Sequence, residues 1–306
     1  MDLGVLRIAG IDAAVFLQGQ LSNDTRRLTE GKCLLAAHSS SQGRVLAVMR
    51  LIPHSSGILA IMPRDLIAAT REQLSKFVLR SKVVIEDASC TITVAGCFGS
   101  NSIQAAGMPA PAAAGDYLEV NGLGIARLSG TIERYWVLGG SAEESAAATP
   151  DGSFAAAWRR ADIDAGFPQV YAATRELFVA QMLNLDLIDG ISFTKGCYTG
   201  QEIIARTQHL GRIKRRMFVL RLPADDYQPG DSLTVIDGRT AKLVEVLNEA
   251  QESRALAVVS LDLGGTPDGE APGVATSGVA TPGVATAGTM RVAAVISPPP
   301  YMAAAA

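Results

Sequence analysis

One cysteine of this sequence stands in a setting that could make it chemically active. Cys197 lies within Lys195-Gly-Cys-Tyr-Thr-Gly-Gln-Glu202. Thr199 and Glu202 have the spacing of a capping box, which predicts that a helix begins about two residues after the cysteine. The free N–H groups and partial positive charge of that helix start, with Lys195 nearby, would favour the thiolate form. The segment therefore predicts a redox-active or transiently ligating thiol.

The same segment could also bind a ligand. Gly196 and Gly200 would let the backbone approach a bound molecule closely, and a helix start can receive a carboxylate. The alternative is an ordinary capped helix in which Cys197 and Tyr198 only pack against their neighbours. Residue spacing alone leaves both interpretations open.

Bulk composition argues against several other functions. The 306 residues carry a formal net charge of −3, so no overall positive field would attract nucleic acid or an anionic membrane. No apolar run of about 18 residues occurs, and charged residues interrupt the N-terminus where a signal peptide would be apolar. We therefore expect a soluble, cytoplasmic protein that does not bind a membrane.

The remaining cysteines and the basic residues give weaker signals. The four cysteines contain no Cys-x-x-Cys pair, and three histidines are too few for a convincing zinc site, so we expect no metal site in this chain. The basic run Arg212–Arg216 could dock tRNA or another anionic partner. A solvated strand edge explains the same run, and direct nucleic-acid binding is not expected.

Strands and helices alternate over residues 1–210, which predicts an α+β fold for this region. Within it, strand, helix and further strands over 55–150 predict a ferredoxin-like subdomain. Short strands separated by turn residues predict a C-terminal antiparallel β-barrel over 211–297. Three copies of Gly-Val-Ala-Thr lie within 264–289 and predict a disordered insertion there.

The cysteine segment and its surroundings resemble the YgfZ-type folate-binding proteins, which are relatives of the glycine-cleavage aminomethyltransferase. The resemblance covers most of residues 1–260 and is carried by these segments: Phe16–Asp24, Leu34–His38, Asp164–Pro168, Leu183–Asp186, Gly190–Phe193 and Lys195–Glu202. It implies an aminomethyltransferase-like ring of α/β subdomains around a pocket for tetrahydrofolate. It also implies a role in iron–sulfur cluster assembly or repair, with cluster proteins, including tRNA-modifying enzymes, or assembly factors as partners.

The resemblance further implies which residues bind the folate. Asp164 falls where relatives hold the pterin ring with a glutamate, and its side chain is one methylene shorter. The other implied folate contacts are Gln181, Asn184, Lys195, Tyr198, Gln201 and Glu202.

One departure from the aminomethyltransferase pattern affects the expected activity. Those enzymes carry adjacent carboxylates on an early strand, where this sequence has Ala47 and Val48. Loss of a general acid or base costs roughly 10²–10⁴-fold in rate. We therefore expect an accessory protein, with a folate-dependent aminomethyl or one-carbon transferase as the alternative.

Overall fold

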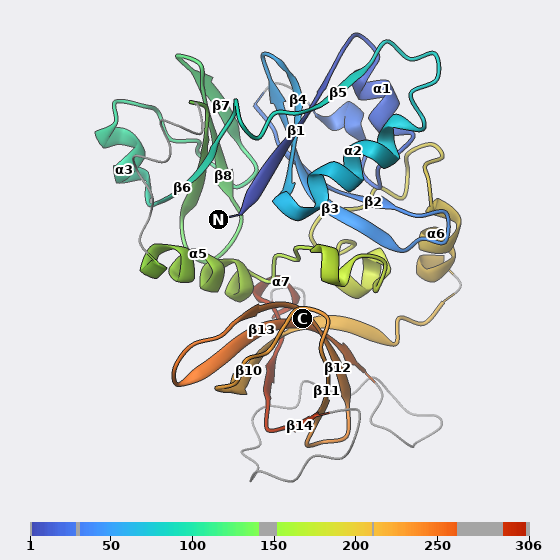
Figure 1. Ribbon diagram of the computed structural model, residues 1–306, viewed down its shortest axis with the longest axis vertical. Coiled ribbons are helices and arrows are strands. Elements are labelled where there is room, and N and C mark those ends of the chain that lie inside the picture. The colour runs from blue at the N-terminus through green and yellow to red at the C-terminus, as the bar shows by residue number, and fades with distance from the viewer. Residues whose placement is uncertain (1, 29–30, 141–151, 210, 262–289, 304–306) are drawn as a thin grey trace.

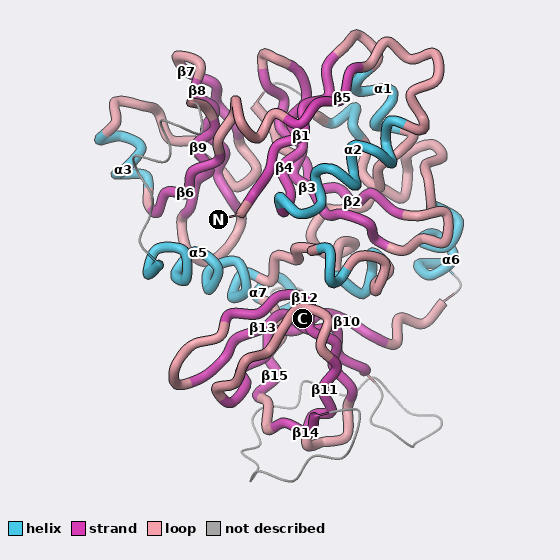
Figure 2. Tube along the Cα trace, viewed as in Figure 1, coloured by secondary structure: helices cyan, strands magenta, loops and turns pink. Residues whose placement is uncertain are grey.

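The computed structural model describes residues 2–28, 31–140, 152–209, 211–261 and 290–303. These residues form three β-sheets with short helices between and around them (Figure 1). Two sheets contain the N-terminal strands, and the third contains the C-terminal strands. A layer of helical segments that begins with α5 (Gly152–Ala165) separates the third sheet from the other two (Figure 2).

The first sheet has the strand order β2-β3-β4-β1-β5, and its strands pair antiparallel. Its strands are β1 (Leu3–Ala9), β2 (Leu34–Ser39), β3 (Val45–His54), β4 (Gly57–Pro63) and β5 (Val84–Asp87). Alternate residues of a strand point to opposite faces. Ala60 and Met62 accordingly join the core under α1 (Ala13–Gln18) and α2 (Ile67–Ser75), whereas Leu59 and Ile61 join the core shared with the second sheet.

The second sheet has the order β6-β9-β8-β7. Its strands are β6 (Val94–Phe98), β7 (Tyr117–Val120), β8 (Leu123–Leu128) and β9 (Arg134–Leu138). The short helix α3 (Ser100–Ala105) packs on it through Ile103, and α5 packs on it through Trp158, whose ring centroid lies 5.2 Å from that of Phe98.

The segment 55–150, which we predicted to form one ferredoxin-like subdomain, is divided between these two sheets. β4 and β5 both pair with β1, whereas β6 to β9 pair only among themselves within the described residues. The boundary between the sheets therefore falls after β5. The reason is the long-range pairing of the N-terminal strand, which local sequence patterns do not reveal.

The third sheet has the order β14-β11-β12-β13-β10-β15 and is curled (Figure 1). Its strands are β10 (Arg215–Pro223), β11 (Ser232–Val235), β12 (Thr240–Leu247), β13 (Glu252–Ser260), β14 (Met290–Val292) and β15 (Val295–Ser297). The pairs are antiparallel except β11 with β14, which is parallel. The predicted insertion at 264–289 lies outside the described residues. The chain continues into α7 (Pro300–Ala303).

After the second sheet and before the third, the chain forms short helical segments that carry half of the predicted site residues. These are α5, the 3₁₀ turns η3 (Ala172–Thr174) and η4 (Ala180–Leu183), and α6 (Gln201–His209); two further 3₁₀ turns, η1 (Thr25–Arg27) and η2 (Arg64–Leu66), flank the first sheet. None of the helices in the described ranges is long and apolar enough to cross a membrane.

Candidate functional site: a cysteine loop beside a chain of cavities

The segment before the cysteine is fixed by buried polar side chains. Asn184, which adopts a left-handed backbone conformation (φ 58°), donates to the Met217 carbonyl at 2.8 Å and to the Tyr301 hydroxyl at 3.1 Å. The Gln181 side chain donates to the Ile204 carbonyl of α6 at 2.7 Å. Both side chains are fully buried. These two residues, predicted as folate contacts, thus join η4 to β10, α7 and α6.

A buried ion pair reinforces this junction. Arg216 of β10 makes two parallel hydrogen bonds to the Asp186 carboxylate, both 2.8 Å long. The carboxylate keeps only 4% of its side-chain exposure. A bidentate pair of this kind fixes geometry as well as contributing energy. The guanidinium of Arg216, the last residue of the basic run, therefore makes a structural ion pair.

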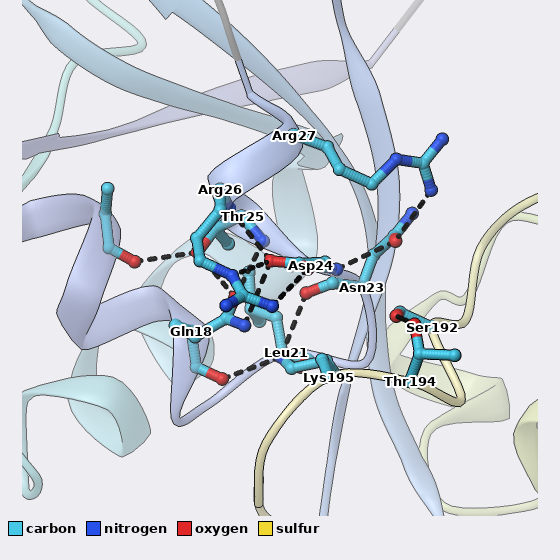
Figure 3. Close-up of polar contacts among 11 residues, drawn as sticks. Gln18, Leu21, Asn23, Asp24, Thr25, Arg26, Arg27, Ser192, Thr194 and Lys195 are labelled. Atoms are coloured by element: carbon cyan, nitrogen blue, oxygen red, sulfur yellow. Dashed lines mark hydrogen bonds and ion pairs between the residues drawn. The ribbon is translucent and has the colours of Figure 1, made fainter.

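Lys195 fastens the cysteine loop, by which we mean residues 188–200, to the anchor segment, residues 18–27. Its ammonium donates to three backbone carbonyls, those of Gln18 at 2.6 Å, Leu21 at 2.6 Å and Asn23 at 2.9 Å (Figure 3). An ammonium has three N–H donors and no acceptor, so these carbonyls use its full capacity. Burial lowers the pKa of Lys195 to about 8, which leaves the group charged at neutral pH.

The anchor segment has its own network of hydrogen bonds. Asp24 accepts two bonds from the Arg26 guanidinium, at 2.9 and 2.7 Å, and one from the Gln18 amide at 3.0 Å (Figure 3). These bonds keep the pKa of Asp24 well below its usual range. The buried Ser22 and Asn23 side chains donate to the carbonyls of Gly190 and Asp189 in the cysteine loop, each at 2.6 Å. The two segments are therefore joined at both side chains and backbone.

Cys197 is exposed at the end of this fastened loop. The neighbouring Tyr198 is buried, and its ring lies 4.7 Å from the Lys195 ammonium. A cation over an aromatic face is an attractive contact. The loop thus buries the residues on either side of the Gly196-Cys197 pair and presents the thiol to solvent.

The helix after the cysteine begins as predicted to within about one residue, but its cap differs from the prediction. α6 starts at Gln201, and the Gln201 side chain accepts a hydrogen bond from the Tyr198 N–H at 3.2 Å. The Thr199 hydroxyl donates instead to the Gln20 side chain at 3.4 Å. The Thr199–Glu202 capping box is therefore wrong in its partners, and Glu202 lies exposed in the first turn.

Gly200 has a packing role in this turn. Its φ is +83°, and a Cβ atom placed there would lie 2.5 Å from the Ser40 carbonyl oxygen of the β2–β3 turn. Both the conformation and the contact exclude a side chain. Gly200 therefore lets α6 start directly against the first sheet.

Three adjoining cavities lie between the sheets. The first cavity, of about 490 Å³, has among its walls Arg27, Lys32, Cys33, Ile188 and Asp189. A narrow cavity of about 30 Å³ shares Leu35, Arg50 and Phe167 with the first cavity, and shares Leu3, Asp162 and Gln169 with the second. The second cavity, of about 340 Å³, is also lined by residues of α5 and β12. The shared walls place the three cavities side by side.

Arg50 of β3 stands where the first and narrow cavities meet. Its guanidinium lies 4.0 Å from the ring centroid of Phe167 and 5.4 Å from that of Trp136. Burial lowers the pKa of Arg50 to about 10, so it remains a cation. Val48, two residues earlier on the same strand, lines the narrow cavity, whereas Ala47 packs in the core. The wall of the narrow cavity is thus apolar at Val48 and cationic at Arg50.

The predicted site residues separate into two groups. Lys195 and Tyr198 lie together in the cysteine loop, next to Gln201 at the start of α6. None of the predicted folate contacts, these three included, lines any of the three cavities. Asp164 instead pairs with Arg254 of β13, at 2.9 Å, on the side of α5 that faces the third sheet. The pairing with Arg254 explains why Asp164 is not available as a wall of these cavities.

The carboxylate that does line the cavities is Asp162, which sequence reasoning missed. It borders both the narrow and the second cavity, and it accepts a hydrogen bond from Arg134 at 2.7 Å. Burial raises the pKa of Asp162, while Arg134 opposes that shift. The sequence signal was present as two acids, Asp162 and Asp164, near the end of a predicted helix.

Glu245 of β12 is a second buried acid, and it lines the second cavity. The Tyr171 hydroxyl donates to its Oε1 at 3.0 Å, and among the described residues its Oε2 has no partner. Burial, and then the neighbouring Asp162, raise the pKa of Glu245 to about 8. The acid is therefore largely protonated at neutral pH.

The first cavity has the size and the wall chemistry that a folate would need. A volume of about 490 Å³ lies within the range typical of small-molecule sites. Phe167 and the Arg50 guanidinium offer flat faces, and two cations, Arg27 and Lys32, could pair with the carboxylates of a glutamyl tail. At the narrow cavity the buried Trp136 indole N–H has no partner within the described residues and could donate to a ligand.

Comparison with known proteins decides the family. No protein-family model matches the chain. A curated relative from Colwellia psychrerythraea (strain 34H), described as tRNA-modifying protein YgfZ, is 36% identical over 242 residues, covering 77% of this chain and 74% of the relative. The chain belongs to the YgfZ family. Proteins of the same description from Yersinia pestis (31% over 235 residues; 73% and 71% covered) and Hamiltonella defensa (30% over 227 residues; 72% and 68%) agree.

Comparison with solved structures finds a similar fold in an enzyme. A crystal structure of the glycine cleavage system aminomethyltransferase T from Bartonella henselae matches with a TM-score of 0.64, covering 85% of this chain and 76% of that chain. Sequence identity is 13%, so the match shows the fold alone. The predicted aminomethyltransferase-like fold is thereby confirmed for this YgfZ-family chain.

The buried acid Glu245 gives a pH prediction. Its pKa is raised on folding, so its contribution to stability is present below about pH 4.5 and is lost as pH rises through about 8. Glu245→Gln keeps an acceptor for Tyr171 and removes the buried charge. We expect thermal melting to show similar stability at pH 5 and a variant more stable by at least about 2 °C at pH 9. Glu249→Gln, near the surface, is the control; a variant less stable than wild type at pH 9 would contradict this assignment.

Proposed function

We propose that this YgfZ-family chain is a tetrahydrofolate-binding accessory protein for iron–sulfur cluster assembly or repair in the cytoplasm. Its clients would be cluster-dependent enzymes, including tRNA-modifying ones, or the factors that assemble their clusters. The observation that carries the proposal is that the first cavity and the exposed thiol share one loop. Ile188 and Asp189 line that cavity, and Cys197 ends the same loop.

Folate would lie in the first and narrow cavities. Phe167 and Arg50 would contact its planar rings, since a guanidinium and an aromatic ring both stack on flat π systems. Arg27 and Lys32 would meet its carboxylates near the surface, where each is now paired, Arg27 with Asp189 at 2.7 Å and Lys32 with Asp116. Reduced folate supplies a one-carbon carrier; in this proposal the chain only binds and orients it.

The cysteine loop would link ligand and client. The Asp189 carboxylate pairs with Arg27 at the cavity wall, and the Asp189 carbonyl accepts a hydrogen bond from the Asn23 side chain. The Asn23 carbonyl in turn accepts a hydrogen bond from the Lys195 ammonium. A ligand carboxylate that drew Arg27 away from Asp189 would therefore act on the segment that presents Cys197. The exposed thiol would serve as a redox group or transient ligand on the client's side.

A folate-dependent aminomethyl or one-carbon transferase is the second candidate, and one observation favours it. Asp162 is a carboxylate at the cavities, although the early strand has Ala47 and Val48 where acids would stand. Its ion pair with Arg134 and the apolar Val48 wall argue for the accessory role. Turnover of an aminomethyl or methyl donor, abolished by Asp162→Asn, would favour the transferase.

Folate binding is tested by titrating the purified chain with 5-formyltetrahydrofolate in a calorimeter. We expect saturable binding at micromolar ligand. Arg50→Met keeps the apolar stem but removes the stacked cation and should weaken binding by about tenfold. Arg80→Met, at an exposed position after α2, is the control. No saturation at micromolar folate, or equal binding by the Arg50 and wild-type proteins, would contradict the site.

The thiol is tested by complementation in a bacterial strain that lacks its YgfZ protein, with cluster-dependent tRNA modification as the readout. Because Cys197 is proposed to contact the client, Cys197→Ala should reduce modification to near the level of the empty strain. Cys90 is also exposed but lies in the connection between β5 and β6, outside the cysteine loop, so Cys90→Ala should behave as wild type. Full activity of Cys197→Ala at matched protein levels would rule out the thiol's role.

A further inference from the structure

The second cavity, of about 340 Å³, has no role in the function proposed above. It lies between α5, the start of β1 and β12, on the far side of the narrow cavity from Arg27 and Lys32. Its polar walls comprise three acids, Asp2, Asp162 and Glu245, together with one arginine, Arg159, and the side chains of Gln169 and Tyr171. The charged residues that line the first cavity are three cations, Arg27, Lys32 and Arg50, and one acid, Asp189, so the two cavities differ in the charge of the ligand that they suit.

Two buried polar groups in the wall of this cavity have no partner among the described residues. One is Oε2 of Glu245, whose residue is 2% exposed, and the other is the indole N–H of Trp158, whose residue is 1% exposed. Leaving a buried polar atom without a hydrogen bond costs its full desolvation penalty. Native structures keep few such atoms, and those that remain call for a bound water, ion or ligand.

The acids of the cavity are only partly neutralised. Asp162 pairs with Arg134 at 2.7 Å through one oxygen, and its side chain retains 13% exposure in the cavity wall. Arg159 lies 3.7 Å from Oε1 of Glu245 and is itself half exposed. Asp2 is exposed at the rim. A cation entering the cavity would meet carboxylates on α5, on β12 and at the start of β1.

We propose that the second cavity binds a small primary amine in its ammonium form, between Asp162 and Glu245. The ammonium would donate to both carboxylates, as charge-assisted hydrogen bonds require. The aliphatic or aromatic part of the amine would pack against Leu3, Leu247 and the α5 side chains. This site shares Asp162 with the narrow cavity, but amine binding does not depend on a bound folate.

Binding of the ammonium should release a proton from the protein near neutral pH. The charged and titratable groups that face Glu245 are Asp162 and Arg159 from α5, Tyr171 from the segment before η3, and Arg134 from β9. Burial and Asp162 hold Glu245 protonated, and Arg159 and Arg134 only partly offset them. An adjacent cation favours the ionised carboxyl, so amine affinity should rise between pH 6 and pH 8.

The test uses benzylamine as the probe and benzyl alcohol as its uncharged match. The chain has two tryptophans, so Trp136→Phe leaves Trp158, in the cavity wall, as the reporter of intrinsic fluorescence. We expect a saturable fluorescence change with benzylamine and none with benzyl alcohol. Calorimetry in two buffers of different ionisation enthalpy should show proton release at pH 7. Equal responses to amine and alcohol, or no saturation at millimolar amine, would overturn the proposal.

Variants distinguish binding of benzylamine in the second cavity from non-specific attraction of cations to the protein. Glu245→Gln should weaken benzylamine binding by about tenfold and abolish proton release, while Glu249→Gln should change neither. Ala155→Leu, at an exposed position in the cavity wall, fills the space without altering charge and should block binding even if Glu245→Gln folds poorly. Unchanged binding in Ala155→Leu, or in a folded Glu245→Gln protein, would overturn the proposal.

Discussion

The arrangement of the site depends on one ammonium group shared by three backbone carbonyls. Lys195 donates to the carbonyls of Gln18, Leu21 and Asn23, and its own residue is 5% exposed. A buried cation is tolerated only where its donors are satisfied, so this geometry ties two segments about 170 residues apart in sequence to each other. These three hydrogen bonds fix the position of the loop that contains the exposed Cys197 and the buried Tyr198 and that leads into α6.

The loop that Lys195 fastens also connects the thiol to the first cavity. The cysteine loop begins at the wall of the first cavity with Ile188 and Asp189, and ends at Cys197. Arg27, at the end of the anchor segment, lines that cavity and pairs with Asp189. A ligand in the cavity and a partner at the thiol would thus contact opposite ends of one short, fastened loop. That arrangement is the structural basis of the accessory role that we propose.

Much of this architecture could be predicted from the sequence, because local patterns determine it. The strands of the third sheet follow from alternating residues and turn signals, and the start of α6 followed from the residues around Thr199. The hydrogen-bond partners could not be predicted in this way. Thr199 bonds to Gln20, which lies 179 residues away, and Lys195 turns toward backbone carbonyls rather than toward the thiol.

The choice between two acids of α5 shows the limit most clearly. Asp162 and Asp164 are two residues apart on a helix, so their side chains point about 200° apart. Sequence resemblance selected Asp164, but the packing of α5 between the sheets turns Asp162 toward the cavities and Asp164 toward Arg254 of β13. Only the tertiary contacts of the helix settle which acid faces a ligand. The pairing of β5 with β1, which divided the predicted subdomain, has the same non-local origin.

We infer that Lys195 holds the cysteine loop in place and does not itself contact folate. Hydrogen–deuterium exchange of Lys195→Met, measured with its affinity for 5-formyltetrahydrofolate, tests this most directly. We predict faster exchange confined to residues 18–24 and 190–200, with folate affinity retained within about threefold, less than the loss of one charge-assisted hydrogen bond. Unchanged exchange in both segments together with lost folate binding would contradict the claim and make Lys195 a ligand residue.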